Sequence, residues 1–219
     1  MAAITLATLR DTVRFRGDYS NVRKFADADV NREIQSAFAE FYELVAETYE
    51  GYWDTSENVT TTASTAYVAL PATAWRTQAV DRLEGSEYVE MFQVGLSERN
   101  KFGSDTGKPL AYWLSARGIN LLPTPDAVYT LRVSFTPIAP ALAESQPREW
   151  FNSWENYVVN ATLLRLDQRE QRPLQERLAV LGLEKERIIA GASRRRAQEP
   201  EYLRLREFDD FDPFKDGLY

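Results

Sequence analysis

Apolar residues near the N-terminus recur every three or four positions, which predicts two helices. The first is short, takes Thr5 as a possible cap, ends before Gly17 and carries Ile4, Leu6, Leu9 and Val13. The second is long and can be capped by Asp27 or Asp29. One face of it is an apolar stripe of Val30, Ile34, Phe38, Phe41, Val45, Tyr49 and Tyr52, and glutamates occupy other positions. Such a stripe is typical of a helix that packs on a core.

The pattern then becomes strand-like, from about Trp53 to Thr136. β-Branched and aromatic residues are dense in the stretches 60–62, 67–71 and 75–83. Residues 112–122 are predicted to form a hairpin that turns at Arg117-Gly118, with Gly118 supplying a positive φ. Strict alternation from Val128 to Phe135 predicts a strand with one buried and one wet face. Within this region, the segment 88–96 fits a short helix.

Helical spacing returns after the breaker-rich connector 137–147. One predicted helix has an apolar face of Trp150, Trp154, Tyr157, Ala161 and Leu164, which places its tryptophans in a core. Beyond Pro173, a second has Leu174, Leu178, Leu181, Ile188, Ile189 and Ala192. The two are expected to form an antiparallel hairpin against the long N-terminal helix.

The order of these elements predicts an α+β fold. The long N-terminal helix and the C-terminal hairpin form a helical bundle, into which an antiparallel β-module is inserted, and an extended C-terminal arm follows. The predicted divisions are residues 1–52 for the N-terminal helices, 53–136 for the β-module, 137–199 for the connector and hairpin, and 200–219 for the arm.

The segment from Pro200 to Tyr219 combines aromatic anchors with carboxylates and has neither a helical nor a strand period. Each buried aromatic side chain contributes on the order of 1.5–3 kcal/mol, so this segment has more apolar surface than a solvated tail needs. Three interpretations remain open from the residues alone: a strap on its own subunit, an arm for a partner, or a disordered tail.

Composition removes most enzyme classes. The 219 residues include no histidine and no cysteine, which excludes histidine-based triads, thiolate nucleophiles and the usual zinc sites. A glycan hydrolase that uses two carboxylates stays as an alternative. However, the acids are numerous and spread along solvated helix faces. We therefore expect a non-enzymatic protein with no catalytic, cofactor-binding or metal-binding residues.

The net charge of the chain and the lengths of its apolar runs limit which partners can be expected. A net charge of −7 opposes sequence-specific duplex binding, which needs a basic footprint. The one compact basic run, 194–196, suits the end of a helix, with contact to an acidic partner or nucleic acid as the second interpretation. The segment 103–108 lacks the spacing of a phosphate-binding loop. No window predicts a membrane span or a signal peptide, so a cytosol-like compartment is expected.

Several short motifs, in this order of elements, resemble the head-to-tail adaptor (connector) proteins of tailed bacteriophages. They are Leu6-Ala-Thr-Leu-Arg-Asp11, the helix start Asp29-Val-Asn-Arg-Glu-Ile-Gln-Ser-Ala-Phe38, Val68-Ala-Leu-Pro71, Gly118-Ile-Asn-Leu-Leu-Pro-Thr-Pro125, Val133-Ser-Phe-Thr-Pro137 and the helix from Trp154 to Leu164. The resemblance implies a structural protein of the virion neck, assembled in the host cytoplasm, and no catalytic residues. The remaining alternative is a monomeric cytoplasmic protein-binding module.

The resemblance also implies specific partners. Such adaptors form a ring, usually twelve-fold, between the portal protein and the next neck or tail protein, and genomic DNA passes through without sequence-specific binding. It favours the arm over the strap, because the arm of such adaptors clamps the portal. The predicted anchors and acids of this arm are Tyr202, Leu205, Phe208, Asp209, Asp210, Phe211, Asp212, Phe214 and Tyr219.

Overall fold

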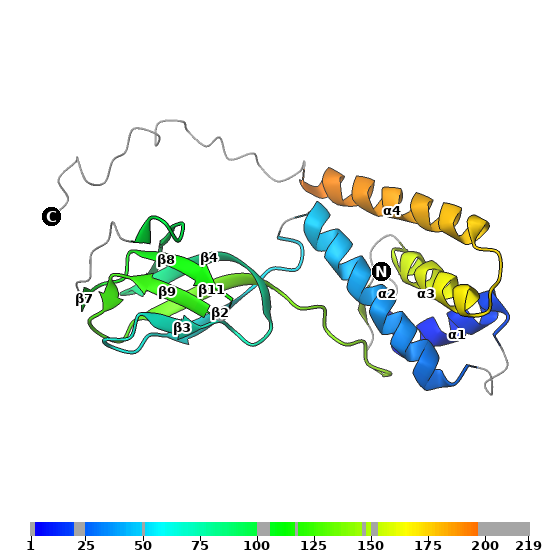
Figure 1. Cartoon of the computed structure of the whole chain (residues 1–219), viewed down its shortest axis with the longest axis horizontal. Helices are drawn as coiled ribbons and strands as arrows, with labels where there is room; N and C mark the ends of the chain where they lie inside the picture. Colours follow the sequence, from blue (N-terminus) through cyan, green and yellow to red (C-terminus); the bar gives the residue numbers. More distant parts are fainter. Residues whose placement is uncertain are drawn as a thin grey trace.

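The computed structural model describes residues 3–19, 25–49, 51–99, 106–116, 118–145, 148–149 and 153–196. In this part of the chain the helices gather at one end of the molecule and most strands at the other (Figure 1). The helices are α1 (Leu6–Gly17), α2 (Asp27–Thr48), α3 (Glu155–Arg169) and α4 (Gln175–Arg196). The predicted mixed α+β class is confirmed.

The strands lie mainly between α2 and α3. They are β1 (Ala3–Ile4), β2 (Thr55–Thr60), β3 (Tyr67–Ala69), β4 (Ala74–Glu84), β5 (Glu87–Glu90), β6 (Phe92–Gln93), β7 (Thr106–Gly107), β8 (Ala111–Ser115), β9 (Gly118–Leu122), β10 (Thr124–Pro125), β11 (Thr130–Pro137) and β12 (Arg148–Glu149). Two of them, β1 and β12, pair with each other next to the helices.

The start of α1 follows the prediction, and the start of α2 does not. The Thr5 hydroxyl accepts a hydrogen bond from the Thr8 amide at 3.2 Å, so Thr5 caps α1. The N-cap of α2 is Ala26, which makes no side-chain cap, and Asp27 is already helical. The prediction of an aspartate cap at 27 or 29 is therefore wrong. The Asp27 carboxylate accepts instead from the Arg14 guanidinium at 2.6 Å, which joins α1 to α2.

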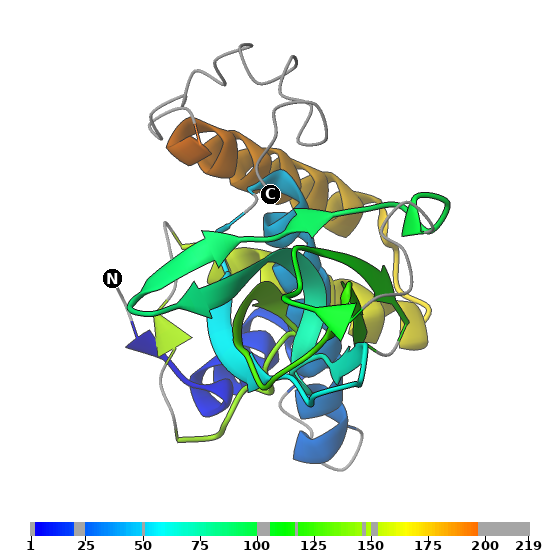
Figure 2. The same ribbon diagram turned by 90° about the vertical axis from the view of Figure 1, so that its left-hand side faces the viewer.

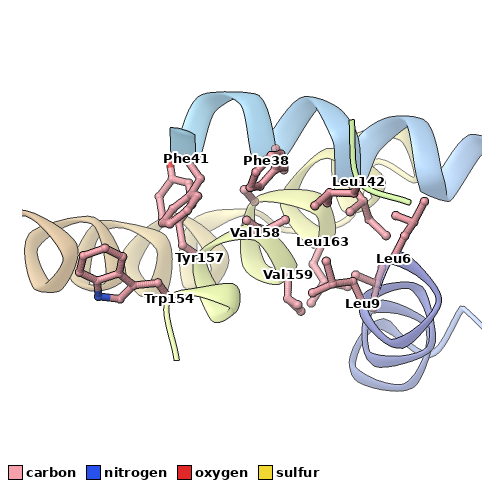
Figure 3. Close-up of a cluster of buried hydrophobic side chains, with 14 of the residues drawn as sticks. Leu6, Leu9, Phe38, Phe41, Leu142, Trp154, Tyr157, Val158, Val159 and Leu163 are labelled. Atoms are coloured by element: carbon pink, nitrogen blue, oxygen red, sulfur yellow. The ribbon is translucent and has the colours of Figure 1, made fainter. Parts of the chain in front are cut away.

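One hydrophobic core unites the four helices (Figure 3). The predicted stripe of α2 supplies Val30, Ile34, Phe38, Phe41 and Val45, each buried. Facing side chains come from α1 and α3, including Leu6, Leu9, Tyr157, Val158, Val159 and Leu163. Burial of a side chain of this size contributes about 1.5–3 kcal/mol, so this core carries much of the stability of the helical part.

The connector after β11 is fixed to α2. Leu142 is buried in the helical core. The side chain of Gln35 makes two hydrogen bonds to the backbone of Leu142, and in the first its amide nitrogen donates to the Leu142 carbonyl at 2.7 Å. The Leu142 amide in turn donates to the Gln35 side-chain oxygen at 3.0 Å. Glu144 accepts from Arg10 at 2.6 Å. The stretch from Leu142 to Glu144, predicted only as part of a breaker-rich connector, thus belongs to the helical end.

Two four-stranded sheets pack face to face around a second core. Their strand orders are β2-β11-β4-β5 and β3-β9-β8-β6. All pairs in them are antiparallel except β6 with β8, which is parallel. The predicted alternation of β11 is confirmed, since Leu131, Val133 and Phe135 point into the core while Arg132 on the other face binds Asp81 at 2.6 Å.

Two predictions within the strands are wrong. The segment 88–96 forms β5 and β6 instead of a short helix, because Gly85 at φ 61° turns the chain and pairs Glu84 with Glu87. The hairpin of β8 and β9 is confirmed, but Gly118 does not have a positive φ. Glycine is required there for space, because a Cβ would lie 2.4 Å from the Val68 carbonyl oxygen.

Candidate interaction surfaces

The predicted portal-binding arm lies outside the described residues, as do all nine of its predicted anchors: Tyr202, Leu205, Phe208, Asp209, Asp210, Phe211, Asp212, Phe214 and Tyr219. What the structure does describe is α4, the helix that leads to this segment and ends at Arg196. The features that hold α4 therefore determine where the arm would begin.

The C-terminal half of α4 is packed on a tryptophan. Trp154, just before α3, is 2% exposed, which confirms its predicted place in the core, while Trp150 lies outside the described residues. A Cβ at Gly191 of α4 would lie 3.3 Å from Trp154 Cζ2, so the backbone of α4 approaches the indole closely. Ile188 and Ala192 of α4 are fully buried on the same side. The C-terminal half of α4 is thus held by close packing.

The N-terminal end of α4 is held by a buried carboxylate. Asp167 of α3 is 3% exposed and accepts hydrogen bonds from the Tyr19 hydroxyl at 2.5 Å and from Arg177 Nε at 2.9 Å. Arg172 Nη1 lies 3.6 Å from the same carboxylate and donates to the Gly17 carbonyl. This network ties the end of α1 and the start of α4 to α3.

The same network perturbs a tyrosine. Burial raises the pKa of Tyr19 well above its ordinary value, and the hydrogen bond to the Asp167 carboxylate raises it further. Every oxygen of this carboxylate has a donor, and the two arginines supply the compensating charge. The arrangement is therefore that of a structural anchor, with no exposed acid or base poised for proton transfer.

An aromatic cluster lies where the helical end meets the strands. Tyr42 stacks on Trp53 at 4.7 Å between ring centroids, and Tyr52 packs edge-on against Trp53 at 4.5 Å. Tyr52 also lies 6.0 Å from Trp154. On the strand side, the Thr136 hydroxyl donates to Asp54 at 2.7 Å. The two chain crossings between the helical end and the sheets are thereby joined to each other and to the core.

A ridge of acids runs along the outer face of α2. Glu40, Glu43 and Glu47 are exposed and share one face of the helix because they are three and four residues apart. Glu40 forms an ion pair with Arg165 at 2.5 Å. Glu43 and Glu47 have no ion-pair partner within the described ranges. This ridge keeps its negative charge and faces solvent.

The sheets enclose a basic group near the end of β4. Arg82 is 3% exposed and binds Glu84 through Nη2, while its Nε and Nη1 have no hydrogen-bond partner in the described part of the chain. Lys108 contacts the same Glu84 at 2.5 Å. Hydrogen bonding to Lys108, and then to Arg82, lowers the pKa of Glu84. These contacts link β4 to the segment before β8.

Two apolar features remain exposed on the helical end. The first is Phe15 of α1, which is 88% exposed. The second is the outer face of α4, where Leu178, Leu183 and Ile189 are 53%, 68% and 37% exposed. The predicted stripe of α4 is therefore split, since Leu181, Ile188 and Ala192 pack inward whereas Leu178 and Ile189 do not.

Sequence reasoning missed both the Asp167 network and these exposed features. Tyr19 and Asp167 are 148 residues apart, and no local pattern links them. Phe15 was detectable, because it lies off the stripe formed by Leu6, Leu9 and Val13.

Neither metal nor membrane chemistry has support in the described ranges. No group of three or more Asp or Glu side chains in them is placed to hold a metal ion. None of the helices described is both long and apolar enough to cross a bilayer.

Comparison with known proteins gives a match to a family model. Residues 4–204 match the sequence model of a family described as SU10 adaptor protein. The match covers all four helices and both four-stranded sheets. No curated protein matches the chain.

Proposed function

Because the chain belongs to the SU10 adaptor protein family, we propose that it forms a ring in the neck of a phage virion, joins the portal vertex to the tail and lets DNA pass. The family match, which spans helices and strands alike, is the observation that carries this proposal, since it gives the chain the role of a structural phage adaptor and virion component. That role is non-enzymatic. Ring formation, portal docking and DNA passage are the steps we add.

In this proposal the parts have separate tasks. The four helices act as one bundle that forms the body of the ring, and the strands form an inserted β-module that faces outward or toward the tail. The segment 200–219 is the arm that reaches the portal. Spaced aromatic anchors on an extended arm suit such docking, and repetition around a ring raises avidity without strengthening any single contact. The next neck or tail protein binds the opposite side.

The arm proposal depends on a firmly held root. The packing of Gly191 on Trp154 and the bonds of Asp167 to Arg177 fix both ends of α4 on the helical core. An arm that begins on a fixed helix loses less conformational entropy on docking than one on a mobile helix. Phe208, Phe211, Phe214 and Tyr219 would fill apolar pockets, and Asp209, Asp210 and Asp212 would meet basic groups on the portal.

Deletion of residues 200–219 tests the arm. We expect the shortened protein to keep the circular dichroism spectrum and the unfolding midpoint of the full chain but to lose binding to the portal. A matched control replaces Asp209, Asp210 and Asp212 by Asn and keeps the aromatic anchors. This variant should still bind the portal, but more weakly than the full natural chain. If the deletion unfolds the body, the segment is an intramolecular strap and the arm proposal is wrong.

The excess of acidic over basic residues suits the passage of DNA through the proposed ring. A negatively charged channel wall repels the phosphates of the duplex, so the duplex can slide. We propose that the ridge on α2 contributes to this wall through Glu43 and Glu47. Replacing both by lysine should slow genome ejection or alter genome retention, whereas replacing both Glu87 and Glu90 of β5 by lysine serves as a control of equal charge change. Unchanged retention and ejection in the first variant would contradict this assignment.

A monomeric protein-binding module would behave differently. It would remain a monomer at micromolar concentration in the presence of portal and show no affinity for it. A glycan hydrolase would lose turnover on a single Glu→Gln change. Either result would replace the adaptor proposal.

A further inference from the structure

The described chain consists of two bodies, and each has a core of its own. The strand body comprises residues 54–99, 106–116 and 118–138, and the helical body comprises the other described residues. They lie side by side in Figure 1, and the view turned by 90° in Figure 2 places the strands in front of the helices. The two hydrophobic cores share no residue.

The bodies also have little contact with each other. Among the elements that the structure describes, the extensive contacts join helix to helix or strand to strand, and none joins a helix to either four-stranded sheet. Two bodies without a large apolar interface are expected to move relative to each other. The two places where the chain crosses between them therefore determine which motion is available.

The first crossing passes from the helical body to the strand body at Asp54. The ring of Trp53 still packs against the helical core, and β2 begins directly after Asp54. Asp54 bonds to both bodies: its amide donates to the Gly51 carbonyl at 3.3 Å, and its carboxylate accepts from the Thr136 hydroxyl at 2.7 Å. The change of body is thus confined to one exposed residue.

The second crossing is equally short. The Ile138 amide donates to the Thr73 carbonyl at 2.8 Å, so Ile138 still belongs to the strand body. Ala139 already packs against the helical core. Pro137 has a fixed φ, and Pro140 restricts Ala139 to extended backbone. Most of the torsional freedom of this crossing is therefore left to Ile138, whose side chain is exposed.

The two crossings are neighbours in space. The hydrogen bond between Thr136 and Asp54 joins them, and Gln78 of β4 donates to the same Thr136 hydroxyl oxygen at 3.2 Å. Two adjacent pivots define one axis, and rotation about this axis changes the angle between the bodies without disturbing either core. The bond opposes this rotation, because it ties Asp54, whose amide is bound to the helical body, to a residue inside the strand body.

We propose that the strand body is hinged to the helical body at Asp54 and Ile138, and that the hydrogen bond from Thr136 to Asp54 is a latch that holds one angle between them. The hinge lets the strand body adjust its angle to the next neck or tail protein. Only this use of the hinge rests on the proposed function, since the hinge itself belongs to the single chain.

Distances between spin labels measure this motion in the full chain, which contains no cysteine of its own. One pair of labels, at Ser36→Cys on α2 and Glu87→Cys on β5, spans the hinge, and all labelled positions are exposed. A control pair, at Glu57→Cys and Glu87→Cys, lies within one sheet. By electron paramagnetic resonance, the hinge-spanning pair should have a distance distribution about twice as wide as the control pair.

Two substitutions of Asp54 test the latch. Asp54→Ala removes the acceptor, so angles that the bond excludes become populated and the hinge-spanning distribution should widen by roughly half again. Asp54→Asn keeps an oxygen that accepts from the Thr136 hydroxyl and should retain the width of the natural chain. The control pair should have the same width in all three proteins.

Each contrary result has a definite meaning. Equal widths for the two label pairs show that the bodies are fixed to each other and overturn the hinge. A hinge-spanning width that Asp54→Ala leaves unchanged overturns the latch. Widening of the control pair shows that the sheet itself deforms, which also overturns the inference.

Negative-stain images of the labelled proteins with portal separate this inference from the proposed function. Rings on the portal together with a narrow hinge-spanning distribution contradict the hinge and leave the adaptor proposal standing. A wide distribution that depends on Asp54, without rings on the portal, supports the hinge and contradicts the ring.

Discussion

Replacing Asp167 with asparagine tests whether a buried carboxylate holds α4 to the rest of the helical end. Asparagine has nearly the same shape and can still accept from Arg177 while its amide faces the Tyr19 hydroxyl. The charge is lost, however. The hydrogen bond with Tyr19, at 2.5 Å, becomes a neutral one, the bond from Arg177 at 2.9 Å keeps only the charge of its donor, and the arginine at 3.6 Å loses its counter-charge.

The expected magnitude follows from these contacts. A hydrogen bond to a charged group contributes about 1.5–3 kcal/mol and a neutral one about 0.5–1.5 kcal/mol, so the conversion of the Tyr19 bond costs roughly 1–1.5 kcal/mol, and the loss of the counter-charge of the two arginines adds to it. Removing one partner of a fully buried ion pair costs roughly 3–5 kcal/mol. The loss here should be smaller, because the side chains of Arg177 and Arg172 are 28% and 43% exposed and water can solvate them. For a chain of this size the melting temperature should fall by roughly 5–10 °C.

Urea unfolding followed by tryptophan fluorescence measures this change, since Trp154 and Trp53 lie in the helical core or against it. The control is Asp11→Asn, an exposed acid on α1 that should change the free energy of unfolding by less than about 0.5 kcal/mol. If Asp167→Asn is as stable as this control, the network does not hold α4. The proposed arm would then begin on a helix that this network does not fix.

Four further substitutions have expected outcomes. Gly118→Ala should lower the free energy of unfolding in urea by at least about 2 kcal/mol, because its Cβ would lie 2.4 Å from the Val68 carbonyl oxygen. Gly182→Ala, in open space on a helical backbone, should be neutral or stabilising by up to about 1 kcal/mol. Equal effects of the two substitutions would contradict this difference between the sites. The raised pKa of Tyr19 means that the unfolded chain loses this proton first, so its contribution to stability is complete below about pH 10 and falls as the pH rises above that value. Tyr19→Phe should therefore reduce the alkaline fall in the urea midpoint, and an identical fall in both proteins would contradict it. Leu142→Ala should cost roughly 2–4 kcal/mol by opening a cavity beside α2, and a heat-unfolding midpoint equal to that of the natural chain would show that the connector does not hold the helices.

The elements with a strong period could be predicted from sequence alone. The apolar stripe of α2 and the alternation of β11 each reflect one buried face. A buried face places apolar residues at regular spacings along the local sequence, so the pattern can be detected without knowledge of tertiary contacts. The cap at Thr5 is equally local. The failure at Asp27 has a physical cause, since its carboxylate binds Arg14 from another helix, and this tertiary contact competes with capping.

The errors within the strands have similar causes. The segment 88–96 contains apolar residues at spacings that suit a short helix, but the turn at Gly85 makes its first residues pair with β4. Gly85 was therefore the better signal there, and it stands two residues before Glu87. At Gly118 the sequence indicated glycine correctly but not the reason, because the close approach of Val68 comes from a strand some fifty residues away.

The interaction surfaces are the least local features of the molecule. The Asp167 network joins residues from three separate segments, and no spacing in the sequence predicts it. The split of the α4 stripe depends on which of its leucines the core can reach, which only the packing of α2 and α3 decides. The arm was assigned from composition and resemblance, and it stays a prediction.

The central claim is that this chain is a ring-forming adaptor that docks on a portal. Negative-stain images of the protein mixed with its portal test this claim most directly. We expect an additional ring of density, coaxial with the portal, that appears with the full chain and is lost when residues 200–219 are deleted. Portal particles without added density at saturating concentrations of the full chain would contradict it.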